Sequence, residues 1–158
     1  MIKKFIFIIL IILFAGGFVA YKISGGEKTQ TPQPYMEVDK YSINLGKVFM
    51  TDGVAKTTFN LKNSGDLEME INALQTSCMC TTVKLIISGN ESPIFGMHAN
   101  PAWKANLAVG ASAVLEVLFD PNAHGPEATG PFERLILVGS NASNKRELQL
   151  KISGVVVK

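Results

Sequence analysis

The stretch "KTTFNLKNSGDLEMEINAL" (residues 56–74) holds two runs of alternating apolar and polar residues on either side of a short turn signal. In residues 56–63, and again in residues 67–74, apolar side chains recur at every second position over most of the run. A period of two is that of a β-strand with one buried face. The Ser-Gly-Asp sequence between the runs is typical of a tight connection. The stretch therefore predicts two neighbouring antiparallel strands.

The same alternation continues through the chain after residue 35. Four further runs show it, residues 36–46 fit a first strand or two, and residues 103–107 fit a short one; the four runs are residues 81–87, 112–120, 133–139 and 147–157. No part of residues 36–158 carries a sustained 3.6-residue apolar pattern, so we expect no helix there. Seven or eight short antiparallel strands joined by turns predict an all-β fold, a β-sandwich.

The N-terminus carries a membrane signal. Residues 5–21 form a run of 17 residues without a charge, directly after Lys3 and Lys4. This run reaches the ~17–25 residues of a membrane-spanning helix and exceeds the ~7–15-residue core of a cleaved signal peptide. We therefore expect residues 1–23 to form an uncleaved signal anchor with one transmembrane helix. Because the two lysines favour the cytoplasmic side, the rest of the chain should be extracytoplasmic, at the cell membrane.

Composition divides the remainder into a linker and a domain. Residues 24–35 are rich in Gly, Pro, Thr and Gln and are expected to be flexible, which leaves residues 36–158 as one domain. Removing the four lysines and one glutamate of residues 1–28 from the 15 basic and 13 acidic residues leaves 11 and 12, a net charge of −1. A near-neutral domain without a basic stretch indicates no nucleic-acid partner. We expect a monomer that meets the membrane through its anchor.

Three stretches carry a resemblance to a known family. They are "TFNLKNSGDLEMEINALQTSCMCTT" (residues 58–82), "LAVGASAVLEVLFDP" (residues 107–121) and "LQLKISGVVV" (residues 148–157). Together they resemble the bacterial domain-of-unknown-function family 1573, which is similar to the immunoglobulin-like domains of the ASH and major-sperm-protein type. This chain departs from the family pattern at Met79, where a glycine is usual, and at residues 109–111, where Pro-Gly-Glu is usual. The resemblance implies an immunoglobulin-like sandwich in an exported or anchored setting, and no activity.

Both cysteines of the chain, Cys78 and Cys80, lie in "TSCMCTT" (residues 76–82). In an extended strand their Cα atoms would lie about 6.5–7 Å apart, with both thiols on one side. A disulfide favours Cα atoms ~4.4–6.8 Å apart, so a bond between them would need a bent backbone and would be strained. If the stretch bends, the sulfur of Met79 can also converge on the thiols. A metal site, a redox pair, and one buried plus one half-exposed structural thiol all stay open.

Soft-metal binding explains the largest number of these residues. Thiolate, thioether and imidazole groups together suit Cu(I), with zinc second. The candidate metal ligands are Cys78, Cys80, Met97, His98 and His124, the last three on long connections rich in Gly and Pro. The sequence therefore suggests copper first and zinc second as a cofactor, and it establishes neither.

Strand counting argues against a single site for all five ligands. The loops with His98 and His124 are two strands apart, so they should share one end of the sandwich. The cysteines lie one strand away from the His98 loop, about 20 Å off at ~3.3 Å per residue, with Met50 at their own end. A single mixed site would require a strand count wrong by one, or a loop that folds back along the sheet.

Three hypotheses of function follow. The first is a membrane-anchored, non-enzymatic immunoglobulin-like module that binds another envelope protein. The second is a copper-binding or copper-delivery protein that uses Cys78 and Cys80 with Met and His ligands. The third is a thiol redox partner. An enzyme is not expected, because no nucleophile elbow, phosphate loop or carboxylate pair is present, and a redox Cys-x-x-Cys pair would have another spacing.

Overall fold

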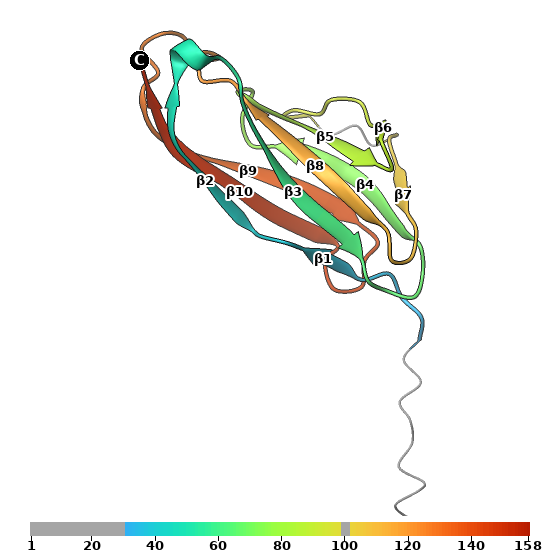
Figure 1. Cartoon of the computed structure of the whole chain (residues 1–158). Helices are drawn as coiled ribbons and strands as arrows, with labels where there is room; N and C mark the ends of the chain where they lie inside the picture. Colours follow the sequence, from blue (N-terminus) through green and yellow to red (C-terminus); the bar gives the residue numbers. More distant parts are fainter. Residues whose placement is uncertain (1–30, 99–101) are drawn as a thin grey trace, which may run out of the picture. The chain divides into compact units, whose positions relative to one another are not determined.

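A computed structural model describes residues 31–98 and 102–158 (Figure 1). These residues form ten strands and one short 3-10 helix: β1 (Met36–Val38), β2 (Ser42–Phe49), η1 (Met50–Asp52), β3 (Ala55–Asn63), β4 (Met69–Thr76), β5 (Thr81–Ile87), β6 (Asn90–Glu91), β7 (Ala105–Leu107), β8 (Ser112–Phe119), β9 (Gly130–Ser140) and β10 (Glu147–Val157). The expected anchor, residues 1–23, and most of the expected linker lie outside this part of the chain. Among the described residues, no helix has the length and apolar character to cross a membrane.

The strands form two five-stranded sheets that face each other (Figure 1). The first sheet has the order β1-β3-β8-β5-β6 and the second the order β2-β10-β9-β4-β7. The predicted all-β sandwich is confirmed, but two details differ. The described strands number ten rather than seven or eight: residues 36–46 hold two strands, β1 and β2, and the two-residue β6 matches no predicted segment. In addition, β2 pairs with β10 in parallel, whereas an antiparallel sandwich was expected.

The alternating apolar residues meet between the two sheets. Phe59 of β3 and Leu115 of β8 are fully buried from the first sheet, and Ile136 of β9 and Leu150 of β10 from the second. Burying an apolar side chain of this size contributes about 1.5–3 kcal/mol. The period-two pattern read from the sequence is therefore the pattern of this core.

Strand β4 changes its alternation halfway, which positions the turn that follows it. Met69 and Ile71 are buried, and then Leu74 and Thr76, because the pairing with β9 shifts between Ile71 and Ala73. Such a bulge adds one residue to one strand of a pair. The phase after the bulge points Thr76 into the protein directly before the two cysteines.

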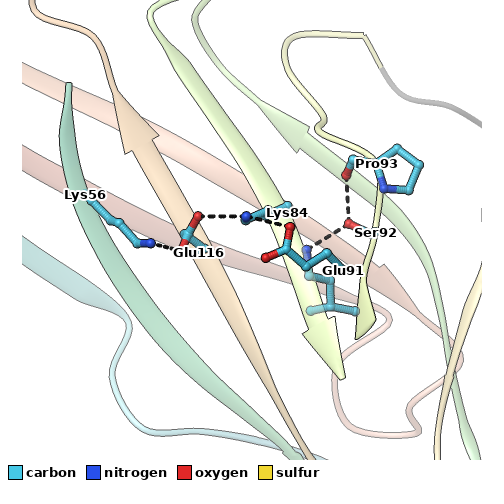
Figure 2. A network of polar contacts seen from close by, with 7 residues as sticks. Lys56, Lys84, Glu91, Ser92, Pro93 and Glu116 are labelled. Atoms are coloured by element: carbon cyan, nitrogen blue, oxygen red, sulfur yellow. Dashed lines mark hydrogen bonds and ion pairs between the residues drawn. The ribbon is translucent and has the colours of Figure 1, made fainter. Parts of the chain in front are cut away.

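Ion pairs cover the outer face of the first sheet (Figure 2). The carboxylate of Glu116 on β8 is only 7% exposed and lies between the ammonium groups of Lys56 on β3 and Lys84 on β5. Lys84 also contacts Glu91 of β6 at 2.8 Å. A buried carboxylate requires such partners. Glu116 is therefore neutralised by its neighbouring strands and has a structural explanation.

The two ends of the sandwich differ. β1 pairs with the last residues of β3, Met36 opposite Asn63. At the other end, η1 lies beside the loop of residues 120–129, where Asn122 Nδ2 donates to the Met50 carbonyl at 3.0 Å. Figure 1 shows β1 and η1 at these opposite ends. We call the second one the η1 end.

Candidate metal centre

The two cysteines lie in a turn, residues 77–80, that joins β4 to β5 at the η1 end. The turn is closed by a hydrogen bond from the Thr81 amide to the Cys78 carbonyl, 3.1 Å. The buried Thr76 hydroxyl lies 3.1 Å from the Cys78 carbonyl and 2.8 Å from the Thr81 carbonyl. Ser77 is paired with Leu135 of β9 through both backbone and side chain. The backbone around the thiols is therefore held from three sides.

Because the stretch bends, the thiols converge. The Sγ atoms of Cys78 and Cys80 lie 2.7 Å apart, and both cysteines are free thiols. Cys80 is 2% exposed, Cys78 is half-buried, and Met79 between them is 66% exposed. The extended geometry considered from the sequence is wrong for these residues, since β4 ends at Thr76 and β5 begins at Thr81.

His124 reaches the same place from the loop of residues 120–129. Its Nε2 atom lies 3.1 Å from Cys78 Sγ. The loop is held against the turn because the Asp120 amide donates to the Cys80 carbonyl at 2.8 Å. One donor atom from each of Cys78, Cys80 and His124 lies within 4.8 Å of the others, which is the spacing of ligands around one metal ion.

Arg134 on β9 adds a positive charge to this group. Its Nε atom donates to Cys80 Sγ at 3.0 Å. The guanidinium is held in place by the Glu133 carbonyl, 2.8 Å from Nη1, and by the ring of Phe132, 5.9 Å from Cζ. A guanidinium stays charged at any pH that a protein tolerates. The cluster therefore pairs two thiols with one permanent cation.

These contacts move the two thiol pKa values in opposite directions. Burial raises the pKa of Cys78, but hydrogen bonds with Cys80 and His124 and the charge of Arg134 outweigh it, so the pKa falls to about 7. Burial and the hydrogen bond with Cys78 raise the pKa of Cys80, although Arg134 and Thr81 oppose the change. The half-buried Cys78 is therefore the thiol that loses its proton first.

The strand-counting prediction was wrong for His124. It assumed one strand between the cysteines and the His98 loop, but a further segment runs back along β5: β6 pairs with its end, and Phe95 then pairs with Val83. With this added reversal, β8 runs toward the cysteine turn, and Thr81 and Phe119 lie opposite each other. The strand count was therefore wrong by one. This is the error that, according to the sequence analysis, a single mixed site would require.

The other predicted ligands are placed differently. The returning segment reaches the end of β4 that precedes the cysteines, where the Thr76 amide donates to the Gly96 carbonyl at 2.9 Å and Gln75 Nε2 donates to the Met97 carbonyl at 2.6 Å. The predicted distance of about 20 Å between the cysteines and the start of this loop is therefore wrong as well. His98 follows Met97 and is exposed, and the group of convergent donors does not include it. The expected position of Met50 at the cysteine end is confirmed by its contact with Asn122. Of the five predicted ligands, the structure therefore brings Cys78, Cys80 and His124 together.

Sequence reasoning missed Arg134, although a signal was present. Phe132, Ile136 and Val138 of β9 are buried, and Arg134 has the same parity. A charged residue in phase with the core-facing residues of a strand is unusual and requires a partner. Here the partner is Cys80.

A pocket of about 190 Å³ opens beside the cluster. His124 and Arg134 line it together with the stacked rings of Phe119 and Phe132, whose centroids lie 4.0 Å apart. This space therefore borders His124 and Arg134, while neither cysteine lines it.

Comparisons with known proteins place the fold. A family model described as protein of unknown function (DUF1573) matches residues 36–94, a segment that contains both cysteines but neither His124 nor Arg134. No curated protein matches the sequence. A protein of unknown function from Porphyromonas gingivalis W83 is similar over 80% of this chain and 50% of its own, with 16% identity and a TM-score of 0.58. This chain thus spans about half the length of that protein.

Two further solved structures are domains of the predicted type. The ASH/PapD-like domain 7 of human CEP192 is 15% identical, with a TM-score of 0.51, over 84% of this chain and 92% of its own. WR4, an MSP family member of C. elegans, is 12% identical, with a TM-score of 0.45, over 77% and 97%. Identities this low show the fold alone. The resemblance read from the sequence is confirmed: residues 36–94 carry the DUF1573 pattern, on an immunoglobulin-like sandwich of unknown function similar to an ASH/PapD-like domain.

Proposed function

We propose that this domain binds one Cu(I) ion between Cys78, Cys80 and His124, as a non-enzymatic metal-binding or metal-delivery module. One observation carries the proposal: donor atoms from two connections, 46 residues apart in sequence, lie within 4.8 Å of one another at the η1 end. Cys80 is part of the core and Cys78 packs against it, but core packing does not explain the exposed imidazole of His124, 3.1 Å from the Cys78 sulfur.

The donor set fits a soft ion. Thiolate sulfur selects Cu(I) and zinc over hard cations, and imidazole suits both. Zinc at a structural site takes four protein ligands in a closed tetrahedron, whereas this group offers three. Bound here, Cu(I) would supply soft Lewis acidity toward a further sulfur or nitrogen ligand.

The charge of the site favours a monovalent ion over a divalent one. Two thiolates contribute −2, and the guanidinium of Arg134, in contact with Cys80, contributes +1. A monovalent ion brings the sum to zero, whereas Zn²⁺ leaves an uncompensated positive charge beside a buried sulfur. The lowered pKa of Cys78 supplies one thiolate near neutral pH, and the ion must displace the proton of Cys80.

We further propose that the module is held at the cell membrane and presents this site to another envelope protein. The apolar run of residues 5–21 after Lys3 and Lys4 supports the anchor. The described chain enters the sandwich at β1, the end opposite the η1 end, where the thiols lie. The mass of the membrane-extracted chain tests this: residues 1–23 should be present, and a mature N-terminus near residue 26 contradicts the anchor.

A second candidate function is thiol–disulfide exchange. The adjacency of the two thiols and the pKa of about 7 for Cys78 favour it. In that reaction the two thiols become a disulfide and give two electrons and two protons to a partner disulfide, which becomes two thiols. Mass measurement after incubation with oxidised glutathione would show the loss of two hydrogens, and a chain that oxidises readily but holds no copper would favour this function.

Competition against a chromophoric Cu(I) chelator tests the copper proposal, with the reduced full-length chain in detergent. We expect one Cu(I) per chain, and loss of most of the affinity in Cys78→Ser and Cys80→Ser. His124→Ala removes one of the three proposed ligands and should weaken binding by at least the ~10–100-fold that loss of an outer-shell partner costs. His98→Ala is the matched control and should bind as the wild type does. A wild type that withdraws no more copper than the double serine variant would contradict the proposal.

A further inference from the structure

The pocket beside the cluster borders one proposed metal ligand, His124, and the guanidinium residue Arg134. These two residues contact Cys78 and Cys80, respectively. Cu(I) takes soft thiolate, thioether and imidazole ligands, so a further soft side chain can join the three protein donors. A side chain placed in the pocket would lie against His124 and Arg134.

Part of the pocket wall is apolar. Phe119, Phe132 and Val156 line it and are 2%, 8% and 5% exposed, respectively. Its volume of about 190 Å³ exceeds the ~10–15 Å³ that a single water requires on the same measure, so it has room for a short, unbranched side chain. An apolar group that enters gains from leaving water, at ~25 cal/mol for each Å² buried.

The two formally charged residues that line the pocket have opposite signs. They are Asp120 and Arg134, so the formal charge of the wall sums to zero. The cluster loaded with Cu(I) is neutral by the charge sum given above. The pocket therefore favours a neutral ligand.

We propose that this pocket receives the side chain of a methionine from a partner protein, whose thioether sulfur binds the Cu(I) held by Cys78, Cys80 and His124. The inference rests on the proposed function. A thioether is neutral, as is the formal charge of the pocket wall, and its sulfur is a soft donor of the kind that Cu(I) prefers. Its apolar chain suits the part of the wall formed by Phe119, Phe132 and Val156. One copper–sulfur bond forms, copper stays in the +1 state and no electron is transferred. None of the residues lining the pocket is a methionine, so the ligand has to come from elsewhere.

Titration of the Cu(I)-loaded full-length chain in detergent with N-acetyl-methionine methylamide tests the proposal. The control probe is N-acetyl-norleucine methylamide, which has the same shape but carries a methylene in place of sulfur. We expect the methionine probe to shift the NMR signals of Val156 and to bind about tenfold tighter to the loaded chain than to the metal-free chain, because the soft donor needs its ion. The norleucine probe should show no such dependence on copper.

A variant that fills the pocket completes the test. Ala128 is a half-buried lining residue, and Ala128→Phe should abolish the binding of the methionine probe while Cu(I) affinity stays unchanged. The exposed Ala108 supplies the control, and Ala108→Phe should behave as the wild type does. A chain that takes up no Cu(I) overturns the proposed function together with this inference. A chain that takes up Cu(I) but binds both probes equally, or binds methionine equally well in Ala128→Phe, overturns this inference alone.

Discussion

At the scale of single residues, Cys78 has the environment that departs most from that of an ordinary thiol. It is half-buried and shares hydrogen bonds with Cys80 and His124, and the positive charge of Arg134 lowers its pKa. Thiolates, not thiols, are the nucleophiles and the metal ligands. Cys78 is therefore the first of the two cysteines to become a thiolate as the pH rises, and its protonation can be measured directly.

Alkylation of Cys78 by iodoacetamide in the metal-free chain should follow its lowered pKa. The thiolate is present above about pH 7 and is lost as the pH falls below it, so the rate should be half-maximal near pH 7. Cys80 is buried and its pKa is raised, so it should react slowly through the same range. His124→Ala removes one hydrogen bond and should move the midpoint for Cys78 upward. A midpoint near 9 in the wild type would show that these contacts do not act on the thiol.

Arg134 should set the preference between monovalent and divalent ions. Arg134→Gln removes the cation next to Cys80 and leaves a site of charge −2, which suits Zn²⁺ better. We expect the ratio of Cu(I) to Zn(II) affinity to fall by about tenfold or more, since a unit charge a few ångströms away contributes on the order of kilocalories at a protein surface. Arg134→Lys keeps the charge and should keep much of the ratio. Equal ratios in all three chains, measured by parallel competition titrations, would contradict this role.

Residue type alone marked Cys78, Cys80 and His124 as candidate ligands, because few side chains bind soft metals, and the structure brings their donor atoms together. It also proposed Met97 and His98, which have the right chemistry but follow the returning segment past β4 instead. Arg134 was missed because it is not a ligand, and only its position among core-facing residues of β9 marks it. The local sequence of a loop does not show which distant loop it will contact in the folded protein.

At the scale of elements, the long strands and the short β1 and β7 fall in predicted segments, whereas the short β6 was not predicted. Segments with period-two apolar residues became β3, β5, β8 and β10 nearly at the expected bounds. The segment from β6 to Phe95 has Pro and Gly nearby and little alternation, and it is held by pairing with β5. This pairing depends on the neighbouring strand β5 rather than on the local sequence pattern of the segment. Because the segment was not predicted, His124 was assigned to the wrong end of the sandwich.

The turn between β3 and β4 gives a test at this scale. A Cβ atom on Gly65 would lie 2.2 Å from the Gln33 carbonyl and 2.4 Å from the Tyr35 amide nitrogen, both backbone atoms that cannot move aside cheaply. Gly65→Ala should therefore lower the free energy of unfolding by about 1–3 kcal/mol, as overpacking commonly does. Urea denaturation of the full-length chain measures it.

Gly96 is the matched control for this substitution. A Cβ atom there would meet no heavy atom within 4 Å, so Gly96→Ala should change the stability by no more than about 0.5 kcal/mol. Equal stability of the Gly65 and Gly96 variants would mean that the segment before β1 does not pack against the turn.

At the scale of the whole molecule, the β-sandwich could be predicted from the sequence, but the pairing of its strands could not. Alternation and turns indicate two packed sheets, but they carry no information about which distant strands pair. The parallel contact of β2 with β10 joins segments about a hundred residues apart, and no hairpin constrains its direction. The order and direction of the strands also bring the loop of residues 120–129 to the cysteine turn. The site is therefore a property of the whole fold rather than of one motif.

The central claim is that Cys78, Cys80 and His124 hold one soft metal ion together. X-ray absorption at the copper edge of the Cu(I)-loaded chain tests it most directly, because it counts the sulfur and nitrogen neighbours of the ion. The account predicts two sulfurs and one imidazole nitrogen in the wild type, no imidazole in His124→Ala and an unchanged spectrum in His98→Ala. Copper bound without an imidazole in the wild type, or copper that is not retained at all, would contradict it.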